Sequence, residues 1–157
     1  SAVSIGIGHY LSTKKVPCVY MQNSGLSNAL NPLISIAHKK VYSIPLILII
    51  GWRGSPRIKD EPQHNVKGKI TEQILKLLNI KYTILRSSND LNKFDKQIKN
   101  AKKNKSITAC LIEQGTLEKN NKIIKRKDYY KLNKEFFLKT LLESLEKKNK
   151  NYFKYGI

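Results

Sequence analysis

The amino-acid sequence predicts an α/β fold with three layers, in which helices cover both faces of a doubly wound, mostly parallel sheet. Segments of extended and of helical character alternate along the chain, which is the order that parallel sheets require. The segment PLILII at residues 45–50 is apolar at every position, as a central strand covered on both faces must be. The later helical segments carry apolar stripes, such as Ile74, Leu75 and Leu78, that suit packing against such a sheet.

The same patterns place the individual elements. Pro32 predicts a kink or a late start in the second helix, and Thr71 is a suitable cap for the third. The residues from Gly51 to Lys67 indicate a long polar loop. We expect one domain over residues 1–157, in which residues 118–157 form a Lys-rich connection and a C-terminal helix. In the remainder we expect helices at residues 2–11, 26–37, 71–79 and 91–103, and strands at residues 16–21, 45–50, 82–85 and 107–112.

The composition is strongly basic, with a formal net charge of +19 at pH 7. Such a charge can mark a nucleic-acid partner, but nearly all of it comes from Lys rather than the forked Arg that specific phosphate recognition favours, so we do not expect nucleic acid to bind. The longest apolar run, residues 45–51, is too short to span a bilayer, and no signal peptide is indicated. We therefore expect a cytoplasmic protein without a membrane partner. Cys18 and Cys110 lie in apolar stretches, which predicts buried free thiols and no metal site.

Two segments follow predicted strands, where ligands of open α/β sheets bind. The first runs from Met21 to Asn28 and enters a helix, with Gly25 permitting a tight turn. Its polar side chains, Asn23, Ser24 and Asn28, would lie beside the positive end of the helix. The pattern is equally typical of a site for an anionic or polar ligand and of an ordinary helix start.

The second segment, GWRGSPRIKDEPQH at residues 51–64, gathers the only Trp, two Arg, a His and two acids after the most buried strand. Arg53 and Arg57 could hold a carboxylate, phosphonate or sulfonate through paired hydrogen bonds. His64, with an ordinary pKa near neutrality, could donate a proton. We favour a functional loop over a merely solvated one, because long loops in compact domains are usually functional or disordered.

Beyond these patterns, four stretches resemble one family. MQNSGLSNALNPL (residues 21–33) and YSIPLILIIGWRGSPRIKDEPQH (42–64) resemble the thiamine diphosphate-dependent 2-oxoacid decarboxylases of the phosphonopyruvate and sulfopyruvate type. GKITEQILKLLNIKYTIL (68–85) and ACLIEQGTL (109–117) are similar to the segments that follow in that family. The GWRG and KDEPQH motifs favour the phosphonopyruvate branch.

The resemblance implies that this chain is the pyrimidine-binding domain, incomplete at its N-terminus. Thiamine diphosphate would lie between it and a diphosphate-binding domain or subunit that holds Mg²⁺, in a homo- or hetero-oligomer. The family's catalytic Glu precedes a helix resembling residues 1–14 and is missing from this chain, so we expect the isolated chain to be inactive. The implied reaction is decarboxylation of phosphonopyruvate, a small anionic 2-oxoacid, to phosphonoacetaldehyde and carbon dioxide.

The resemblance also assigns residues to this site. We expect the cofactor to be lined by Gln22, Asn23, Ser24, Gly25 and Asn28, and the substrate by Arg53, Asp60, Gln63 and His64, with Arg53 facing the phosphonate and His64 as a catalytic proton donor. No metal ligand is expected in the chain itself. Two alternatives remain open: the alpha subunit of a two-chain sulfopyruvate decarboxylase, and a basic binding module without catalysis.

Overall fold

The structure is a computed structural model that describes residues 1–117. Contacts between residues divide the chain into two units, Ser1–Glu118 and Lys119–Ile157. The Lys-rich connection and C-terminal helix expected for residues 118–157 lie outside the described residues, so both stay predictions.

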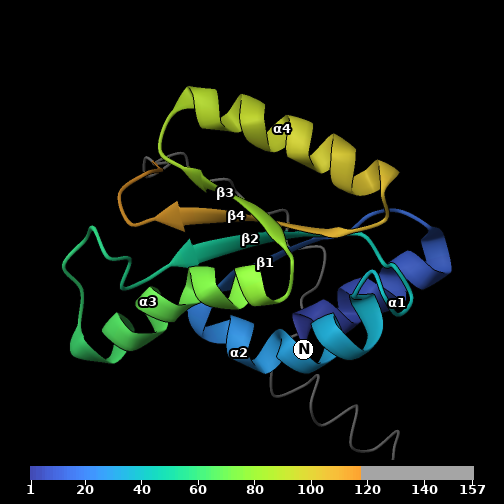
Figure 1. The fold of residues 1–157 in the computed structure, drawn as a ribbon, viewed down its shortest axis with the longest axis horizontal. Coiled ribbons are helices and arrows are strands. Elements are labelled where there is room, and N and C mark those ends of the chain that lie inside the picture. The colour runs from blue at the N-terminus through green and yellow to red at the C-terminus, as the bar shows by residue number, and fades with distance from the viewer. Residues whose placement is uncertain (118–157) are drawn as a thin grey trace, which may run out of the picture. The chain divides into compact units, whose positions relative to one another are not determined.

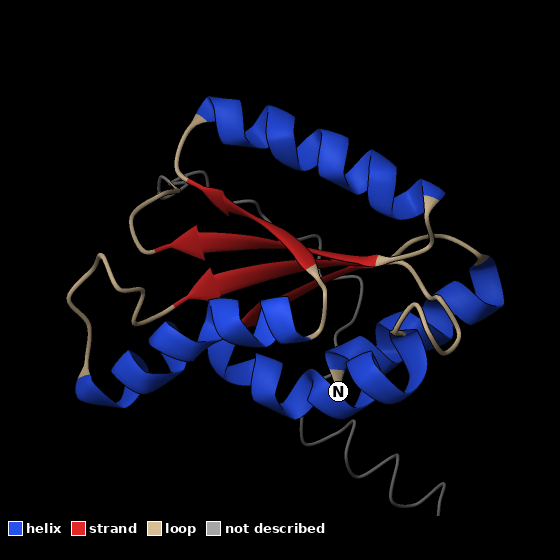
Figure 2. Cartoon of the chain, in the orientation of Figure 1, coloured by secondary structure: helices blue, strands red, loops and turns tan. Residues whose placement is uncertain are grey.

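The described residues form a four-stranded sheet in which every neighbouring pair of strands is parallel (Figures 1 and 2). The strands stand in the order β1-β2-β4-β3, so the two strands of highest apolar content lie in the middle. The predicted α/β fold with a parallel sheet and helices on both faces is confirmed. In chain order the elements are α1 (Ala2–Thr13), β1 (Cys18–Gln22), α2 (Asn23–Pro32), the π-helix η1 (Leu33–Ala37), β2 (Leu46–Trp52), α3 (Pro62–Leu77), β3 (Lys81–Leu85), α4 (Ser88–Lys103) and β4 (Ile107–Glu113).

The helices cover the two faces of the sheet unequally. α1, α2, η1 and α3 lie on one face and α4 alone on the other (Figure 1). The larger core lies under the first group, where Leu46, Leu48 and Ile50 of β2 are fully buried. The smaller core, on the α4 side, is built around Phe94 and Cys110. None of the helices within residues 1–117 is long and apolar enough to cross a membrane.

The unequal covering of the two faces by helices explains why the prediction of two buried thiols is right for Cys110 and wrong for Cys18. Cys110 is buried in the central strand β4, and burial raises the pKa of its thiol to about 11. Cys18 is exposed, contrary to expectation, because it lies on the edge strand β1 on the face that α4 leaves open. Tyr20, two residues further along β1 and on the same face, is 74% exposed.

The start of α3 differs most from the sequence-based expectation. The helix begins at Pro62 rather than near Thr71, so it absorbs six residues of the predicted loop 51–67. Pro is favoured in the first turn of a helix, where its missing N–H has no intrahelical partner to lose. Thr71 is therefore not a cap. It is buried in mid-helix, and its hydroxyl donates to the carbonyl of Lys67 at 2.6 Å.

The other helix and strand boundaries differ less from those predicted from the sequence. α2 begins at Asn23, three residues before the predicted start, and the irregularity expected at Pro32 takes the form of the π-helix that follows it. α4 begins at Ser88 because Ser87 and Asp90 form a reciprocal capping box, a local signal for a helix start. β1 is shifted by two residues from its predicted start, to Cys18.

Two glycines allow α3 to approach the end of β2. The backbone of Gly54, at φ 66°, is pressed against Gly68, and a Cβ on Gly68 would overlap the Gly54 carbonyl group. The contact also lets the Trp52 ring nitrogen donate to the Gly68 carbonyl at 2.9 Å. The position of α3 against the loop after β2 therefore depends on the absence of a side chain at residue 68.

We expect Gly68→Ala to lower the free energy of unfolding by about 3 kcal/mol or more, because the backbone of α3 or of the loop must shift. Gly8→Ala is the matched control. It is also a helical glycine, but a Cβ there meets nothing within 4 Å, so the change should be neutral or stabilise by up to about 1 kcal/mol. Urea unfolding of the two variants measures both values. Equal effects would show that the close approach at Gly68 does not constrain the fold.

Candidate functional site

The carboxyl ends of the four parallel strands meet at one edge of the sheet (Figure 1). The register pairs Gln22 with Gly51 and Trp52 with Glu113. It also pairs Leu85 with Ile112, which places the residue after β3, Arg86, near the end of β4. Side chains that lie between 22 and 114 in the sequence are thereby gathered along one edge.

A cavity of about 320 Å³ opens at this edge, and we call it the strand-end cavity. Two of the predicted site residues, Gln22 and Arg53, line it together. Its wall combines apolar side chains with amide, guanidinium and carboxylate groups, which suits a small polar ligand with a flat or apolar part. The lining residues are Tyr20, Gln22, Gly51, Trp52, Arg53, Ile112, Glu113, Gln114 and Leu117.

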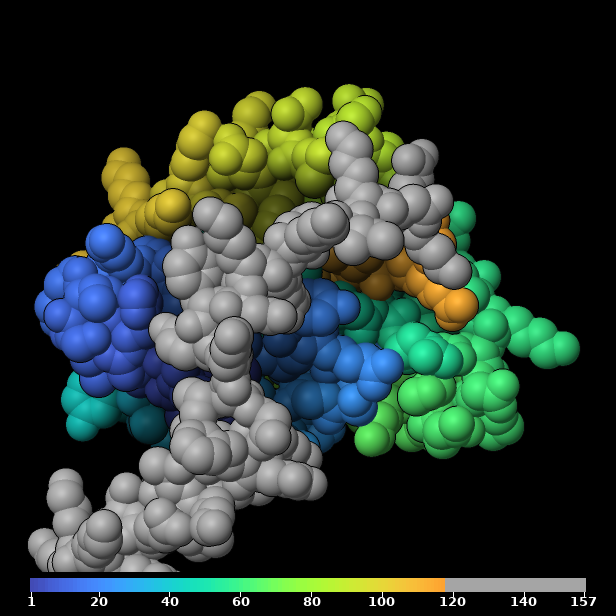
Figure 3. Space-filling model, turned by 180° about the vertical axis from the view of Figure 1, so that it is seen from behind, coloured from blue at the N-terminus to red at the C-terminus, as the bar shows by residue number. Residues whose placement is uncertain are grey.

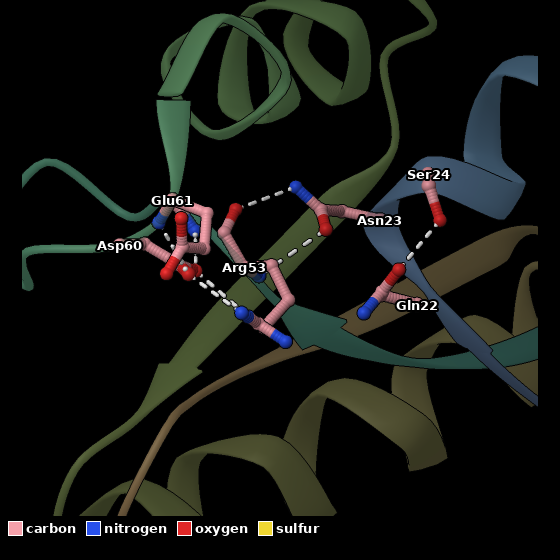
Figure 4. A network of polar contacts seen from close by, with 7 residues as sticks. Gln22, Asn23, Ser24, Arg53, Asp60 and Glu61 are labelled. Atoms are coloured by element: carbon pink, nitrogen blue, oxygen red, sulfur yellow. Dashed lines mark hydrogen bonds and ion pairs between the residues drawn. The ribbon is translucent and has the colours of Figure 1, made fainter. Parts of the chain in front are cut away.

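Arg53 is held at its backbone by Asn23, the first residue of α2 (Figure 4). The Asn23 amide nitrogen donates to the Arg53 carbonyl at 2.9 Å, and its oxygen accepts from the Arg53 N–H at 3.2 Å. The same nitrogen donates to the Thr71 hydroxyl at 3.1 Å. Asn23 is buried, and these bonds use both of its amide hydrogens. The structure therefore gives it the role of joining three segments, whereas contact with a cofactor remains a prediction.

Asp60 holds the side chain of Arg53. Its carboxylate accepts from Nε of Arg53 at 2.7 Å and from Nη2 at 2.6 Å, and also from the backbone N–H groups of Gly54 and Glu61, both at 2.8 Å. The Arg53 hydrogen bonds, helped by these two N–H groups, hold the pKa of Asp60 well below its ordinary value despite desolvation. The same pairing raises the pKa of Arg53. The guanidinium that was expected to face the phosphonate is thus bound to a carboxylate within the chain.

The segment Gln22–Asn28 contains the end of β1 and the start of α2. Ser24 donates its hydroxyl to the Gln22 side-chain oxygen at 2.7 Å (Figure 4). No side chain caps the first turn of α2, so its N–H groups are available to an acceptor. A Cβ at Gly25 would make only ordinary contact with the side chain of Met21, at 3.5 Å, and Asn28 is exposed. The roles of Ser24, Gly25 and Asn28 toward a cofactor stay predictions.

Gln63 and His64 lie on the first turn of α3 rather than in the loop where they were expected. Gln63 is exposed and His64 is half-buried. Neither residue lines the strand-end cavity. The structure therefore does not bring them together with Gln22 and Arg53, and the proton-donor role of His64 stays a prediction.

Sequence reasoning missed two residues of this edge, Arg86 and Glu113. Arg86 lies directly after β3, and Glu113 ends β4 with its side chain 8% exposed. Their ion pair is long, with Nε to Oε2 at 3.4 Å and Nη2 to Oε1 at 3.5 Å. The signal that could have found them is the strand-end rule that singled out residues 21–28 and 51–64, applied to the other two strands.

A second cavity, of about 350 Å³, adjoins the first, and we call it the arginine pocket. Glu113 and Gln114 belong to the walls of both cavities. The full set of residues lining it is Arg57, Ile58, Arg86, Glu113, Gln114, Gly115 and Thr116. Within residues 1–117, no group of three or more His, Cys, Asp or Glu side chains is placed to hold a metal ion.

Comparison with known proteins finds relatives among decarboxylases, whereas no family model matches the chain. It is 42% identical over 73 residues to phosphonopyruvate decarboxylase of Streptomyces viridochromogenes, which is 46% of this chain and 18% of that protein. The corresponding protein of Streptomyces hygroscopicus is 37% identical over 89 residues, covering 57% of this chain and 21% of the relative. The alpha subunit of sulfopyruvate decarboxylase from Methanococcus maripaludis is 36% identical over 80 residues, covering 51% of this chain and 46% of the relative.

The chain thus spans about a fifth of the phosphonopyruvate decarboxylases and less than half of the alpha subunits that it matches. Within that span, the resemblance indicated by the motifs is confirmed: this chain is similar in sequence to phosphonopyruvate decarboxylase and to the alpha subunit of sulfopyruvate decarboxylase.

Proposed function

We propose that this chain forms one side of the active site of an enzyme that decarboxylates an anionic 2-oxoacid, with phosphonopyruvate as the first candidate and sulfopyruvate as the second. The observation that carries the proposal is the similarity to two kinds of decarboxylase whose named substrates share one design, a pyruvate that bears a second acidic group. The strand-end cavity and the arginine pocket support it, because together they offer cationic and amide groups at the place where α/β sheets bind ligands.

We propose thiamine diphosphate as the cofactor, with its pyrimidine ring on this chain. A pyrimidine ring needs an apolar surface for its faces and hydrogen-bonding groups for its edge. The strand-end cavity fits these needs, since Tyr20 and Ile112 can supply the surface and the amides of Gln22 and Gln114 can supply the edge contacts. When bound, the cofactor would take up the electron pair left behind as carbon dioxide departs. The diphosphate and Mg²⁺ would be held by a second domain or subunit.

The chain's own residues would bind and orient. Gln22 and the first turn of α2 offer donors and acceptors next to the cavity, and Ser24 fixes the Gln22 side chain through its hydroxyl. Asn23 and Asp60 hold Arg53 from its backbone and its side chain, so the wall formed by the end of β2 is rigid. Preorganised walls of this kind lower the cost of ordering a substrate for reaction. His64 is assigned no step, because it does not line the cavity.

The alpha subunits among the relatives favour a related arrangement, in which this chain pairs with a separate diphosphate-binding subunit. The two arrangements share the site and differ in whether both halves belong to one polypeptide. Co-purification of the tagged chain from its native cells separates them. A second, thiamine diphosphate-binding polypeptide in stoichiometric amount supports the two-subunit form, and its absence from a decarboxylating preparation contradicts that form.

The function is tested by measuring carbon dioxide release from phosphonopyruvate and sulfopyruvate with thiamine diphosphate and Mg²⁺. The full protein encoded by the gene is assayed with the 157-residue chain in parallel. We expect turnover by the full protein that is lost without the cofactor, and none by the isolated chain. No turnover of either substrate by the cofactor-loaded full protein would refute the proposal. In the 157-residue chain, fluorescence of Trp52, its only tryptophan and part of the cavity wall, reports cofactor binding independently.

The Asp60 contacts make a prediction about pH. Because the pKa of Asp60 is lowered in the folded chain, its contribution to stability is complete above about pH 4, the ordinary Asp value, and is lost as the pH falls toward the lowered pKa. Asp60→Asn should therefore lower Tm at pH 7, and the gap from the unchanged chain should shrink below about pH 4. Asp95→Asn, which removes an exposed partner of Lys99, is the control and should open no such gap. A gap for Asp60→Asn that persists unchanged at the lowest pH would show that the charge is not its source.

A further inference from the structure

Three arginines lie at the carboxyl edge of the sheet: Arg53 after β2, Arg57 in the loop that follows, and Arg86 after β3. Arg57 and Arg86 both line the arginine pocket. We propose that this pocket binds the distal anionic group of the substrate, a phosphonate or sulfonate, while the 2-oxoacid end lies in the strand-end cavity. The proposal rests on the proposed function and assigns specificity to Arg86 and Arg57, in place of Arg53.

The ion pairs of Arg53 and Arg86 differ in bond length, and this difference decides which of the two arginines is available to bind the anionic group. Arg53 donates to Asp60 at 2.7 and 2.6 Å in a forked pair, and the Asp60 side chain is only 5% exposed. Arg86 meets Glu113 at 3.4 and 3.5 Å, beyond the range of strong charge-assisted hydrogen bonds. The exposures are nearly the same in the two pairs, 36% and 5% for Arg53 and Asp60 against 40% and 8% for Arg86 and Glu113, so the difference lies in bond length. Two short bonds must break before the Arg53 side chain can turn, but only two long ones before that of Arg86 can. Arg53 also lines the strand-end cavity and not the arginine pocket, so its remaining N–H groups do not serve the distal anion.

Arg57 adds a second donor group to the same pocket. It is exposed, and within the described part of the chain no ion pair holds its guanidinium. A phosphonate or sulfonate presents three acceptor oxygens, which suits two converging guanidinium groups better than one. In the space-filling view the segment after β4 lies beside the loop that follows β2, which is the loop that carries Arg57 (Figure 3).

Glu113 connects the pocket to the site of the proposed reaction. It belongs to the walls of both cavities, as Gln114 does, so a ligand with one end in each cavity would lie beside it. Its carboxylate also competes with an incoming anion for Arg86. The two partners of one ion pair are therefore expected to act on anion affinity in opposite directions, which a general attraction to a basic surface does not predict.

The test is a titration of the full 157-residue chain with methylphosphonate and, separately, with methanesulfonate, at constant ionic strength, with Kd obtained by calorimetry or NMR. Arg86→Gln should raise Kd by about tenfold or more, the worth of hydrogen bonds to a charged group. Glu113→Gln should lower Kd by about two- to fivefold, the worth of a partly exposed ion pair. Lys40→Gln, at the opposite end of the sheet, removes the same charge as Arg86→Gln and should leave Kd unchanged.

Each outcome bears on the proposal. An equal loss of affinity in Lys40→Gln and Arg86→Gln would show only diffuse attraction to the basic surface and would overturn it, as would weaker binding in Glu113→Gln. Circular dichroism checks that each variant is folded. If Arg86→Gln does not fold, Arg57→Gln takes its place, because Arg57 is exposed and its loss should weaken binding without disturbing the core. The ligand that binds more tightly identifies phosphonate or sulfonate as the preferred group.

Failure of this inference is distinguishable from failure of the proposed function. The titration needs neither cofactor nor turnover, so opposite effects of Arg86→Gln and Glu113→Gln would establish the anion pocket even in a protein that does not decarboxylate. Conversely, a full protein that decarboxylates phosphonopyruvate with KM unchanged by Arg86→Gln would keep the function and remove the pocket from it. A selective rise in KM with kcat preserved is the result we expect, because the distal group binds equally in the ground state and the transition state.

Discussion

The backbone of Arg53 is the point on which the arrangement of the strand-end edge depends. Asn23 closes on it from the start of α2 with two hydrogen bonds, and Thr71 fixes Asn23 from the middle of α3. A buried amide without partners would cost on the order of 1–3 kcal/mol, so these contacts strongly favour one placement of the three segments. In that placement Gly54 also lies so close to Gly68 that a Cβ on Gly68 would overlap the Gly54 carbonyl group. The walls of the strand-end cavity are therefore positioned by contacts that no ligand needs to supply.

Because of this constraint, Arg53 and Arg86 have different roles. A side chain that fixes the path of its own loop, as Arg53 does through Asp60, cannot also turn toward a ligand without releasing that loop. Arg86 has no such structural role, because its hydrogen bonds to Glu113 are long. Both residues are arginines at strand ends, and both have a carboxylate partner. The difference in bond length, together with the two backbone N–H groups that Asp60 also accepts from, separates a structural arginine from one available to an anion.

Much of the fold follows from local patterns in the sequence. The apolar run of β2 and the alternation of elements are sufficient to predict a parallel sheet with helices on both faces, and the strand-end rule points to Gln22 and Arg53. The rest depends on contacts between distant residues. Asn23 and Thr71 are separated by 48 positions in the sequence, and Arg86 and Glu113 by 27. The periodicity of the sequence does not reveal such pairs. Thr71 was therefore predicted to cap a helix and Asn23 to contact a ligand.

The net charge of +19 sets the condition that any anion site in this chain must meet. A surface rich in lysine attracts every anion, and that attraction is diffuse and screened by salt. To discriminate between anions, a site needs groups in fixed positions whose favourable interactions are lost when the wrong anion binds. A buried carboxylate beside a guanidinium meets that need, because an anion must displace Glu113 from Arg86 before it gains a hydrogen bond there. An anion that cannot offer several oxygens to Arg86 and Arg57 together would gain less free energy from its new hydrogen bonds than is lost with the Arg86–Glu113 interaction. On this basis an acidic side chain, and not a further basic one, makes the arginine pocket selective within a basic protein.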